Sequence, residues 1–151
     1  RRWRTVSVES IFAALTPFYD RAIAGLTRET VWRARLVERI GARPGEAILD
    51  IGSGTGSLAI AVTAAEPGCI YRGIDPDEAA VAIARQKATA AGSMATFEVG
   101  RFGERPVGDG ERPDKIVCSL VLHQVPLAEK RRLLAAMLDA LKPGGELFIA
   151  V

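Results

Sequence analysis

Cysteine, histidine and aromatic residues are scarce in this chain. Among its 151 residues are two cysteines and one histidine, and 6% of the residues are aromatic. Two cysteines make no disulfide framework, and these two have no metal-ligand spacing. Cys69 and Cys118 each lie in an apolar, strand-like run. We therefore expect buried free thiols, no metal site and a reducing, cytoplasmic environment.

Long apolar runs and a dominant charge are also missing. No run of 18 apolar residues and no signal peptide are present, so a membrane-spanning helix and secretion are unsupported. The net charge is +2, with 48% hydrophobic residues, as in an ordinary globular domain. Residues 1–43 carry nine arginines and four acids, a net charge of +5. A solvated helical face is the simpler interpretation of this basic segment, and an acidic substrate or a membrane surface is the alternative.

Hydrophobic periodicity divides the chain into a helical N-terminal part and an alternating remainder. Ser10–Ile40 has helical spacing with a break near Gly25, and Thr27 is a plausible N-cap for a second helix. The expected strands are Ala47–Ile51, Cys69–Ile74, Ala95–Val99, Lys115–Leu120 and a fifth that starts at Glu146. The expected helices are Gly56–Ala65, Pro76–Ala91 and Pro126–Leu141. Pro76 suits a first helical turn, and Gly92 suits a C-terminal stop.

The last of these helices carries a stripe of apolar side chains that predicts core packing. Its members are Leu133, Leu134, Met137, Leu138 and Leu141. Strands that alternate with helices predict an α/β fold, Rossmann-like and doubly wound, with a mainly parallel sheet and helices on both faces. Ligands of such sheets bind outside the carboxyl ends of the strands. Asp50, Asp75, Arg101 and Ser119 stand at those ends, so we expect them to converge.

The most informative segment is Ala47–Gly56, an apolar run that ends in an acid and three glycines at every second position. It predicts a strand, a tight turn and a helix start, where α/β proteins bind nucleotide-like ligands. Glycine suits this turn because it adopts positive φ freely and allows a ligand close to the backbone. The spacing is D-x-G-x-G-x-G, and Ser57 occupies the position of the third glycine in a dinucleotide fingerprint.

Two acids near this turn suit ligand groups of different kinds. Asp50 can accept hydrogen bonds from a ligand ammonium, directly or through water; alternatively it only braces the turn. Asp75 can accept hydrogen bonds from both hydroxyls of a ribose; alternatively it caps the helix that follows. Neither acid by itself identifies the ligand, because nicotinamide sites use a similar acid.

The glycine motif resembles motif I of the class I S-adenosylmethionine-dependent methyltransferases, and three further segments match that family in order and spacing. These segments are Gly73-Ile74-Asp75-Pro76, the fourth-strand run Asp114–His123, and Leu141–Ile149 with its Lys-Pro-Gly-Gly turn. The resemblance covers about Pro44–Val151. The N-terminal run Thr16–Asp20, followed by a helix into Arg43-Pro44-Gly45, is similar to the ubiquinone and menaquinone biosynthesis branch, whose members act on small molecules.

The resemblance implies roles for individual positions. Gly52, Gly54 and Gly56 pass along the methionine part of the cofactor, Asp50 faces its amino group, and Asp75 holds the ribose. Ile74 and Pro76 pack near the adenine, Ser119 and Leu120 border the methyl group, and Tyr19 closes over the cofactor. The expected cofactor-binding residues are Tyr19, Asp50, Ile51, Gly52, Ser53, Gly54, Gly56, Ile74, Asp75, Pro76, Arg101, Phe102, Ser119 and Leu120.

One position departs from the family pattern. The family usually has an acid after the third strand that binds the adenine amino group, and Arg101 stands there. Arginine cannot accept a hydrogen bond, so the amino group needs a backbone carbonyl or another acceptor. Phe102 can stack on the adenine ring. His123 and Tyr19 are weak catalytic candidates, because His123 more often shapes the site than transfers a proton.

These patterns predict an enzyme that transfers methyl groups from S-adenosyl-L-methionine to a small-molecule or lipid-like acceptor, with S-adenosyl-L-homocysteine as product. The alternatives are a degenerate or truncated cofactor-binding domain without catalysis, and an NAD(P)-binding oxidoreductase. We expect an N-terminal helical cap (1–43) and a core (44–151) that lacks the two C-terminal hairpin strands of the family. No basic stripe with interleaved aromatics predicts a nucleic-acid partner. The acceptor and the oligomeric state stay open, a homodimer included.

Overall fold

The computed structural model describes residue 25 and residues 28–105, 108–119 and 125–150. Tyr19, Leu120 and His123 lie outside the described residues. The chain divides into two compact units, residues 1–36 and 37–151. The first unit contains most of a helix over residues 28–40, as the sequence predicted. Every strand of the described residues belongs to the second unit.

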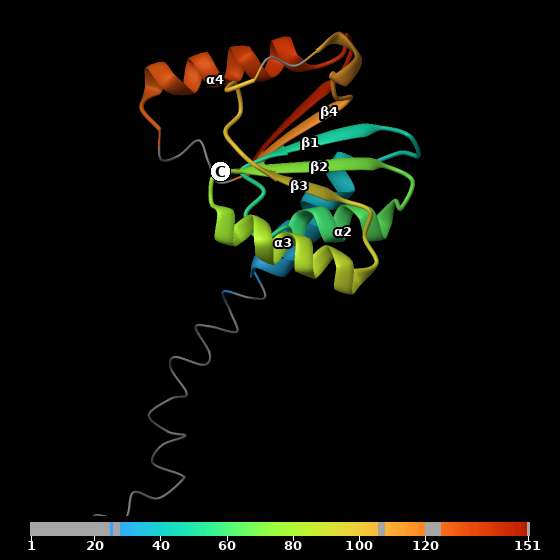
Figure 1. Ribbon diagram of the computed structural model, residues 1–151. Coiled ribbons are helices and arrows are strands. Elements are labelled where there is room, and N and C mark those ends of the chain that lie inside the picture. The colour runs from blue at the N-terminus through green and yellow to red at the C-terminus, as the bar shows by residue number, and fades with distance from the viewer. Residues whose placement is uncertain (1–24, 26–27, 106–107, 120–124, 151) are drawn as a thin grey trace, which may run out of the picture. The chain divides into compact units, whose positions relative to one another are not determined.

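The second unit is built on a sheet of five parallel strands (Figure 1). The strands are β1 (Ala47–Ile51), β2 (Ile70–Asp75), β3 (Thr96–Val99), β4 (Lys115–Ser119) and β5 (Glu146–Ala150). Their order is β3-β2-β1-β4-β5. From β1 the chain adds β2 and β3 on one side, then crosses back and adds β4 and β5 on the other side of β1. All four pairings are parallel. The predicted α/β fold is confirmed, and each strand lies within a residue or two of its predicted bounds.

Three helices cover the two faces of this sheet. They are α2 (Ser57–Ala65), α3 (Glu78–Ala91) and α4 (Leu127–Ala140). In Figure 1, α2 and α3 lie against one face and α4 lies against the other. The arrangement is doubly wound, as predicted from the alternation of strands and helices.

The ends of α3 explain one difference from the predicted bounds. Gly92 ends the helix at φ 66°, as expected of a C-terminal glycine. The start lies later than Pro76, because the carboxylate of Asp77 accepts hydrogen bonds from the backbone N–H groups of Ala79 and Ala80. Asp77 is therefore the N-cap, and Pro76 precedes the helix.

One apolar core lies between the sheet and α4. Its buried members are Leu49, Ile51, Ile74, Ile116, Cys118, Met137, Ala140 and Leu141. The predicted stripe of α4 is confirmed for Met137 and Leu141, whereas Leu138 is exposed because it lies on the outer side of the helix. Both cysteines are buried free thiols, as predicted.

The connection from β3 to β4 crosses this same face of the sheet without an α-helix. Its described part contains only a short 3-10 turn, η1 (Asp109–Glu111). Crossover connections between parallel strands are usually helical. Here Phe102 packs on the core as a partly buried side chain. A loop covers less of the sheet than a helix, which leaves space beneath the connection.

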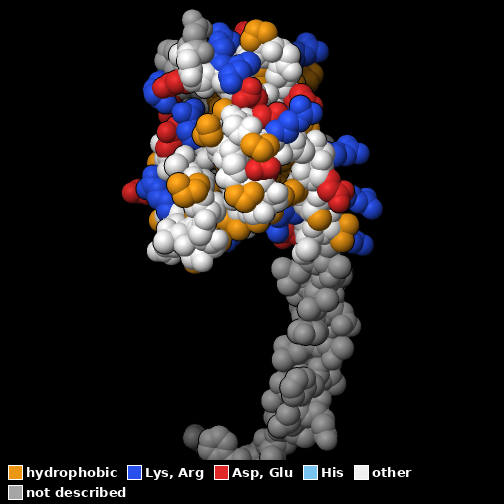
Figure 2. Space-filling view, turned by 90° about the vertical axis from the view of Figure 1, so that its right-hand side faces the viewer, with side chains coloured by type: hydrophobic (Ala, Val, Ile, Leu, Met, Phe, Trp, Pro, Cys, Tyr) orange, Lys and Arg blue, Asp and Glu red, His pale blue; other side chains and the backbone are white. Residues whose placement is uncertain are grey.

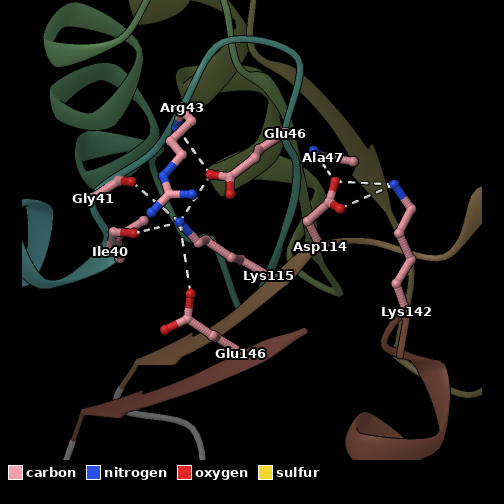
Figure 3. A network of polar contacts seen from close by, with 9 residues as sticks. All are labelled: Ile40, Gly41, Arg43, Glu46, Ala47, Asp114, Lys115, Lys142 and Glu146. Atoms are coloured by element: carbon pink, nitrogen blue, oxygen red, sulfur yellow. Dashed lines mark hydrogen bonds and ion pairs between the residues drawn. The ribbon is translucent and has the colours of Figure 1, made fainter. Parts of the chain in front are cut away.

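A polar network ties the strands together at the edge of the sheet where they begin (Figure 3). The Nζ of Lys115, in a residue only 4% exposed, donates to the carbonyls of Ile40 (2.8 Å) and Gly41 (3.1 Å) and pairs with Glu46 at 2.8 Å. Lys115 thereby fixes the C-terminal end of helix 28–40 against the start of β4.

A second part of the network centres on Asp114. Its Oδ2 accepts the backbone N–H of Ala47 at 2.8 Å and pairs with Lys142 at 3.0 Å. These bonds connect β1 with the turns before β4 and β5. They lie at the opposite end of the strands from the predicted site and act on the fold alone.

Figure 2 shows the side of the molecule at which β1 begins. Acidic and basic side chains are interspersed there, and hydrophobic side chains lie among them. No helix within the described ranges combines the length and the apolar character that crossing a membrane requires.

Candidate functional site

A cavity of about 670 Å³ opens where the strands end, on the face of the sheet that α4 covers. Its volume lies within the usual range of small-molecule pockets. Its walls come from the ends of β1, β2 and β4, from the connection after β3, and from α4. The lining residues are Ile51, Gly52, Ile74, Asp75, Pro76, Gly100, Arg101, Phe102, Gly103, Glu104, Ser119, Val125, Glu129, Arg132, Leu133 and Met137.

Asp75 is the residue at which the strand-end loops meet. Its Oδ2 accepts the backbone N–H of Gly54 at 2.8 Å, and its Oδ1 accepts that of Asp77 at 2.9 Å. Its backbone carbonyl accepts the N–H of Gly100 at 3.0 Å. One residue therefore fixes the glycine turn, the start of α3 and the loop after β3. The carboxylate keeps acceptor capacity beyond these two bonds, because each oxygen has two lone pairs.

The glycine turn is held against the end of β2. The N–H groups of Gly52 and Ser53 both donate to the carbonyl of Ile74, at 2.9 and 3.1 Å. Gly56 is the N-cap of α2 at φ 76°, and a Cβ there meets Ala84 and Phe97 at 2.9 Å. Only glycine satisfies both conditions without strain. Because Gly56 has no side chain, the first N–H groups of α2 receive no side-chain cap and can face an anionic group.

Asp50 does not share the cavity with the other strand-end residues. Successive strand residues point to opposite faces, and the neighbours of Asp50, Leu49 and Ile51, pack toward α4. Asp50 therefore points to the face of α2 and α3, where it is 1% exposed and accepts a hydrogen bond from Tyr71 at 2.9 Å. Burial raises the pKa of Asp50 to about 7, although the Tyr71 hydrogen bond acts to lower it.

The loop after β3 supplies an acid that the sequence pattern did not single out. Arg101 lines the cavity, as expected, and its backbone N–H donates to Oε2 of Glu104 at 3.2 Å. Glu104 lines the cavity as well. A carboxylate is therefore present three residues beyond the position where the family usually has one. Phe102 also lines the cavity while its ring packs on the core.

The structure brings together most of the residues predicted for the site. Those that line the cavity are Ile51, Gly52, Ile74, Asp75, Pro76, Arg101, Phe102 and Ser119. Four others, Asp50, Ser53, Gly54 and Gly56, are described and lie outside the lining. The expected convergence therefore holds for Asp75, Arg101 and Ser119, and the placement of Asp50 corrects it, because its side chain faces the other side of the sheet.

Sequence reasoning missed the wall that α4 contributes. Leu133 and Met137 belong to the stripe that predicted core packing, and they pack on the core and line the cavity together. Glu129 and Arg132 form an exposed ion pair one turn earlier, with Nε to Oε2 at 3.0 Å. This pair lowers the pKa of Glu129 and raises that of Arg132. Helical spacing predicts which residues of α4 share one face of the helix. It does not predict that part of this face borders a cavity instead of the sheet.

Comparisons with known proteins agree with this geometry. The sequence model of a family described as a methyltransferase domain matches residues 48–145. The ubiquinone/menaquinone biosynthesis C-methyltransferase of Bordetella avium is 32% identical over 142 residues, which cover 93% of this chain and 53% of that protein. The ubiquinone biosynthesis O-methyltransferase of Hahella chejuensis is 29% identical over 118 residues, covering 78% and 48%.

Solved structures share the fold. The S-adenosylmethionine-dependent methyltransferase of Geobacter sulfurreducens, in complex with S-adenosyl-L-homocysteine, superimposes with a TM-score of 0.63 at 28% identity, covering 78% of this chain and 46% of that one. The chain spans about half the length of the curated relatives that it matches.

Proposed function

Because this chain belongs to the methyltransferase domain family, we propose that its cavity binds S-adenosyl-L-methionine and that the protein transfers the methyl group to a small-molecule acceptor, leaving S-adenosyl-L-homocysteine. The relative of Geobacter sulfurreducens was solved with that product. Three features in chain order support the same assignment. They are the glycine turn, Asp75 at the end of β2 and Ser119 at the end of β4. The hydrogen-bonding groups of Asp75, of the start of α2 and of Asp50 fit the ribose and the amino-acid end of this cofactor.

The observation that carries the proposal is the position of Asp75. Its carboxylate lines the cavity and is fixed by two backbone N–H groups, so its remaining lone pairs point from a rigid support. A ribose presents two adjacent hydroxyl donors, which suit such a carboxylate. Gly52 and Pro76 flank Asp75 in the lining, where a close backbone approach and an apolar ring suit the sugar and the base.

A second fit concerns the amino-acid end of the cofactor. The N–H groups at the start of α2 are without a side-chain cap and suit its carboxylate. The Oδ1 atom of Asp50 is buried and has no hydrogen-bond partner in the described part of the chain. A buried acceptor without a partner is costly, and a cationic donor relieves that cost. The amino group of the cofactor is such a donor where the cofactor extends from the cavity, past Gly52, over the glycine turn that follows Asp50.

When bound, the cofactor supplies a methyl group that its sulfonium already activates, so the difficult chemistry belongs to the cofactor. The chain's own residues bind, orient and exclude water. Ile51, Leu133 and Met137 give the cavity an apolar wall, and Ser119 places a hydroxyl at the end of β4. Holding the reacting groups in line is worth roughly 7–11 kcal/mol. We assign no general base, and His123 and Tyr19 stay untested candidates.

We place the acceptor among small apolar molecules. Relatives named as quinone-biosynthesis enzymes methylate either carbon or oxygen, according to their names. In this chain the apolar wall of α4, with Val125 at its start, supports an acceptor with an apolar body. The atom that receives the methyl group stays open between carbon, oxygen and nitrogen.

Calorimetric titration with S-adenosyl-L-methionine and, separately, with NADH tests the proposal. We expect micromolar affinity for the first ligand and none for NADH. Asp75→Ala lowers that affinity by at least about tenfold, because it removes a charged acceptor of two hydroxyl groups. Asp77→Ala is the matched control: it removes the N-cap of α3, which costs about 1 kcal/mol of stability, and leaves the affinity unchanged.

Two results contradict the proposal. A folded wild-type sample that binds neither ligand favours a domain that keeps the fold without the cofactor. Binding of NADH in place of S-adenosyl-L-methionine favours the oxidoreductase alternative. Circular dichroism of each variant shows whether it is folded.

A further inference from the structure

A buried polar pair lies behind the glycine turn, on the face of the sheet away from the cavity. The hydroxyl of Tyr71 donates to Oδ2 of Asp50 at 2.9 Å, and the two residues are 2% and 1% exposed. They come from the neighbouring strands β1 and β2. The ring of Tyr71 provides apolar packing, but a phenylalanine provides that as well. What the hydroxyl adds in the described part of the chain is its hydrogen bond to Asp50.

The two oxygens of Asp50 are in different states. Oδ2 is bonded to Tyr71, whereas Oδ1 is buried without a partner within the described ranges. Nearly all buried polar atoms in proteins are hydrogen-bonded, so an orphaned carboxylate oxygen needs an explanation. A purely structural carboxyl at this position gains nothing from its second oxygen, because desolvation of that oxygen only destabilises the fold.

The groups that face Asp50 offer no positive charge. Tyr71 comes from β2 and Asp75 from the end of β2; burial raises the pKa of Asp50, and the charge of Asp75 raises it further. Cys118 of β4 packs on the opposite face of the sheet, together with Ile51. None of these groups is a cation. A ligand at the glycine turn, which begins two residues after Asp50, can supply the donor that Oδ1 lacks.

We propose that Tyr71 is a positioning residue for ligand recognition: its hydroxyl holds Oδ2 of Asp50, so that Oδ1 stays available to the positively charged amino group of a ligand at the glycine turn. The contact with the ligand is direct or passes through one water molecule. This inference rests on the proposed function, because the amino group is that of S-adenosyl-L-methionine or its product. It assigns to β2 a part in binding in addition to Asp75.

Recognition of this kind depends on the charge of Asp50. An ionised carboxylate attracts the amino group, and a protonated one does not. The Tyr71 hydrogen bond favours the ionised form, and burial and Asp75 oppose it. Removal of the hydroxyl therefore moves the ionisation of Asp50, and with it the binding of the ligand, to higher pH.

Tyr71→Phe tests this inference because it removes the hydroxyl and keeps the ring. Carboxyl-labelled aspartate allows the ionisation of Asp50 to be followed by NMR without ligand, with Asp50→Asn to assign the signal. We expect the midpoint to rise by at least half a pH unit. Calorimetry with S-adenosyl-L-homocysteine between pH 6 and pH 8.5 then shows an affinity loss of about three- to tenfold near pH 7. The loss narrows at pH 8.5.

Thr63→Val is the matched control. It also deletes one buried hydroxyl, whose hydrogen bonds go to the carbonyl of Ala59 on α2 at 2.8 Å and to the hydroxyl of Ser93 at 2.7 Å rather than to Asp50. We expect a similar loss of stability and no shift of the Asp50 midpoint. A Tyr71→Phe protein whose midpoint and pH profile match those of the wild type overturns the inference alone. A folded wild type that binds no S-adenosyl-L-homocysteine at any pH overturns the inference and the proposed function together.

Discussion

At the residue scale, we propose that Glu104 supplies the acceptor that Arg101 lacks. Arginine at position 101 removes an acceptor, and the loop turns so that the backbone N–H of Arg101 donates to the carboxylate of Glu104. The turn brings Glu104 into the cavity wall together with Gly100. A purine with an amino group finds its acceptor there, provided that the proposed function holds.

Glu104→Ala tests this role with two ligands. The affinity for S-adenosyl-L-homocysteine falls by about three- to tenfold, because one charged hydrogen bond is lost. The affinity for the analogue with oxygen in place of the 6-amino group does not fall, because that oxygen donates nothing to a carboxylate. Glu129→Ala, which removes another carboxylate of the lining, serves as control in the same titrations. Equal losses for the two ligands contradict the assignment.

At the scale of elements, the start of α2 depends on the absence of a side chain at Gly56. Alanine there must adopt φ 76° and place its Cβ 2.9 Å from Ala84 and Phe97. Gly54 has a similar φ of 53° with open space around the Cβ position, so it isolates the backbone cost. We expect Gly54→Ala to lower the free energy of unfolding by about 1–2 kcal/mol, and Gly56→Ala by about 3 kcal/mol. Urea unfolding measures both, and equal values exclude a packing contribution.

The beginnings of the strands depend on Lys115. Its amine is buried, with three close oxygen partners, and Glu46 loses its charge partner when the amine is removed. We expect Lys115→Met to lower the free energy of unfolding by about 3 kcal/mol. Lys142→Met removes the more exposed pair with Asp114 and costs less than about 1 kcal/mol. If the two variants are equally stable in urea, the buried network does not hold the strands together.

The pH dependence of stability is a property of the whole molecule. The folded pKa of Asp50 is raised to about 7, above its ordinary value near 4, so the folded state holds a proton that the unfolded state has released. The free energy of unfolding therefore falls as the pH rises toward 7 and levels off above it. The expected decrease between pH 5 and pH 8 is roughly 3 kcal/mol.

Two other acids act in the opposite direction at lower pH. Hydrogen bonds from Lys115 lower the pKa of Glu46, and the backbone N–H of Ala47 and Lys142 lower that of Asp114. Their stabilisation is complete above their ordinary pKa values and is lost as the pH falls through the lowered ones. The free energy of unfolding is therefore greatest near about pH 4 to 5, above the pH at which Glu46 and Asp114 lose their stabilisation and before most of the decrease that Asp50 causes. In urea titrations Asp50→Asn removes the decrease toward pH 8, and an unchanged slope rules out Asp50 as its cause.

The amino-acid sequence by itself determined the order of the helices and strands and the edge of the sheet at which the site lies. Periodicity separated strands from helices to within a residue or two, because a period of 2 or 3.6 is a local property. The glycine turn, Asp75 and Ser119 followed from the same reasoning, because parallel strands end at one edge of a sheet. Family membership rested on motifs that are short, ordered and local.

Tertiary structure decided which side chains share a space. It turned Asp50 away from the cavity toward Tyr71, brought Glu104 beside Arg101, and made Leu133 and Met137 a wall of the cavity as well as part of the core. It also enclosed Lys115 among partners that are far away in the chain. Apart from the contact between Arg101 and Glu104, these contacts join residues that are far apart in the chain. Their geometry depends on strand order and on a crossover without a helix, which no local period encodes.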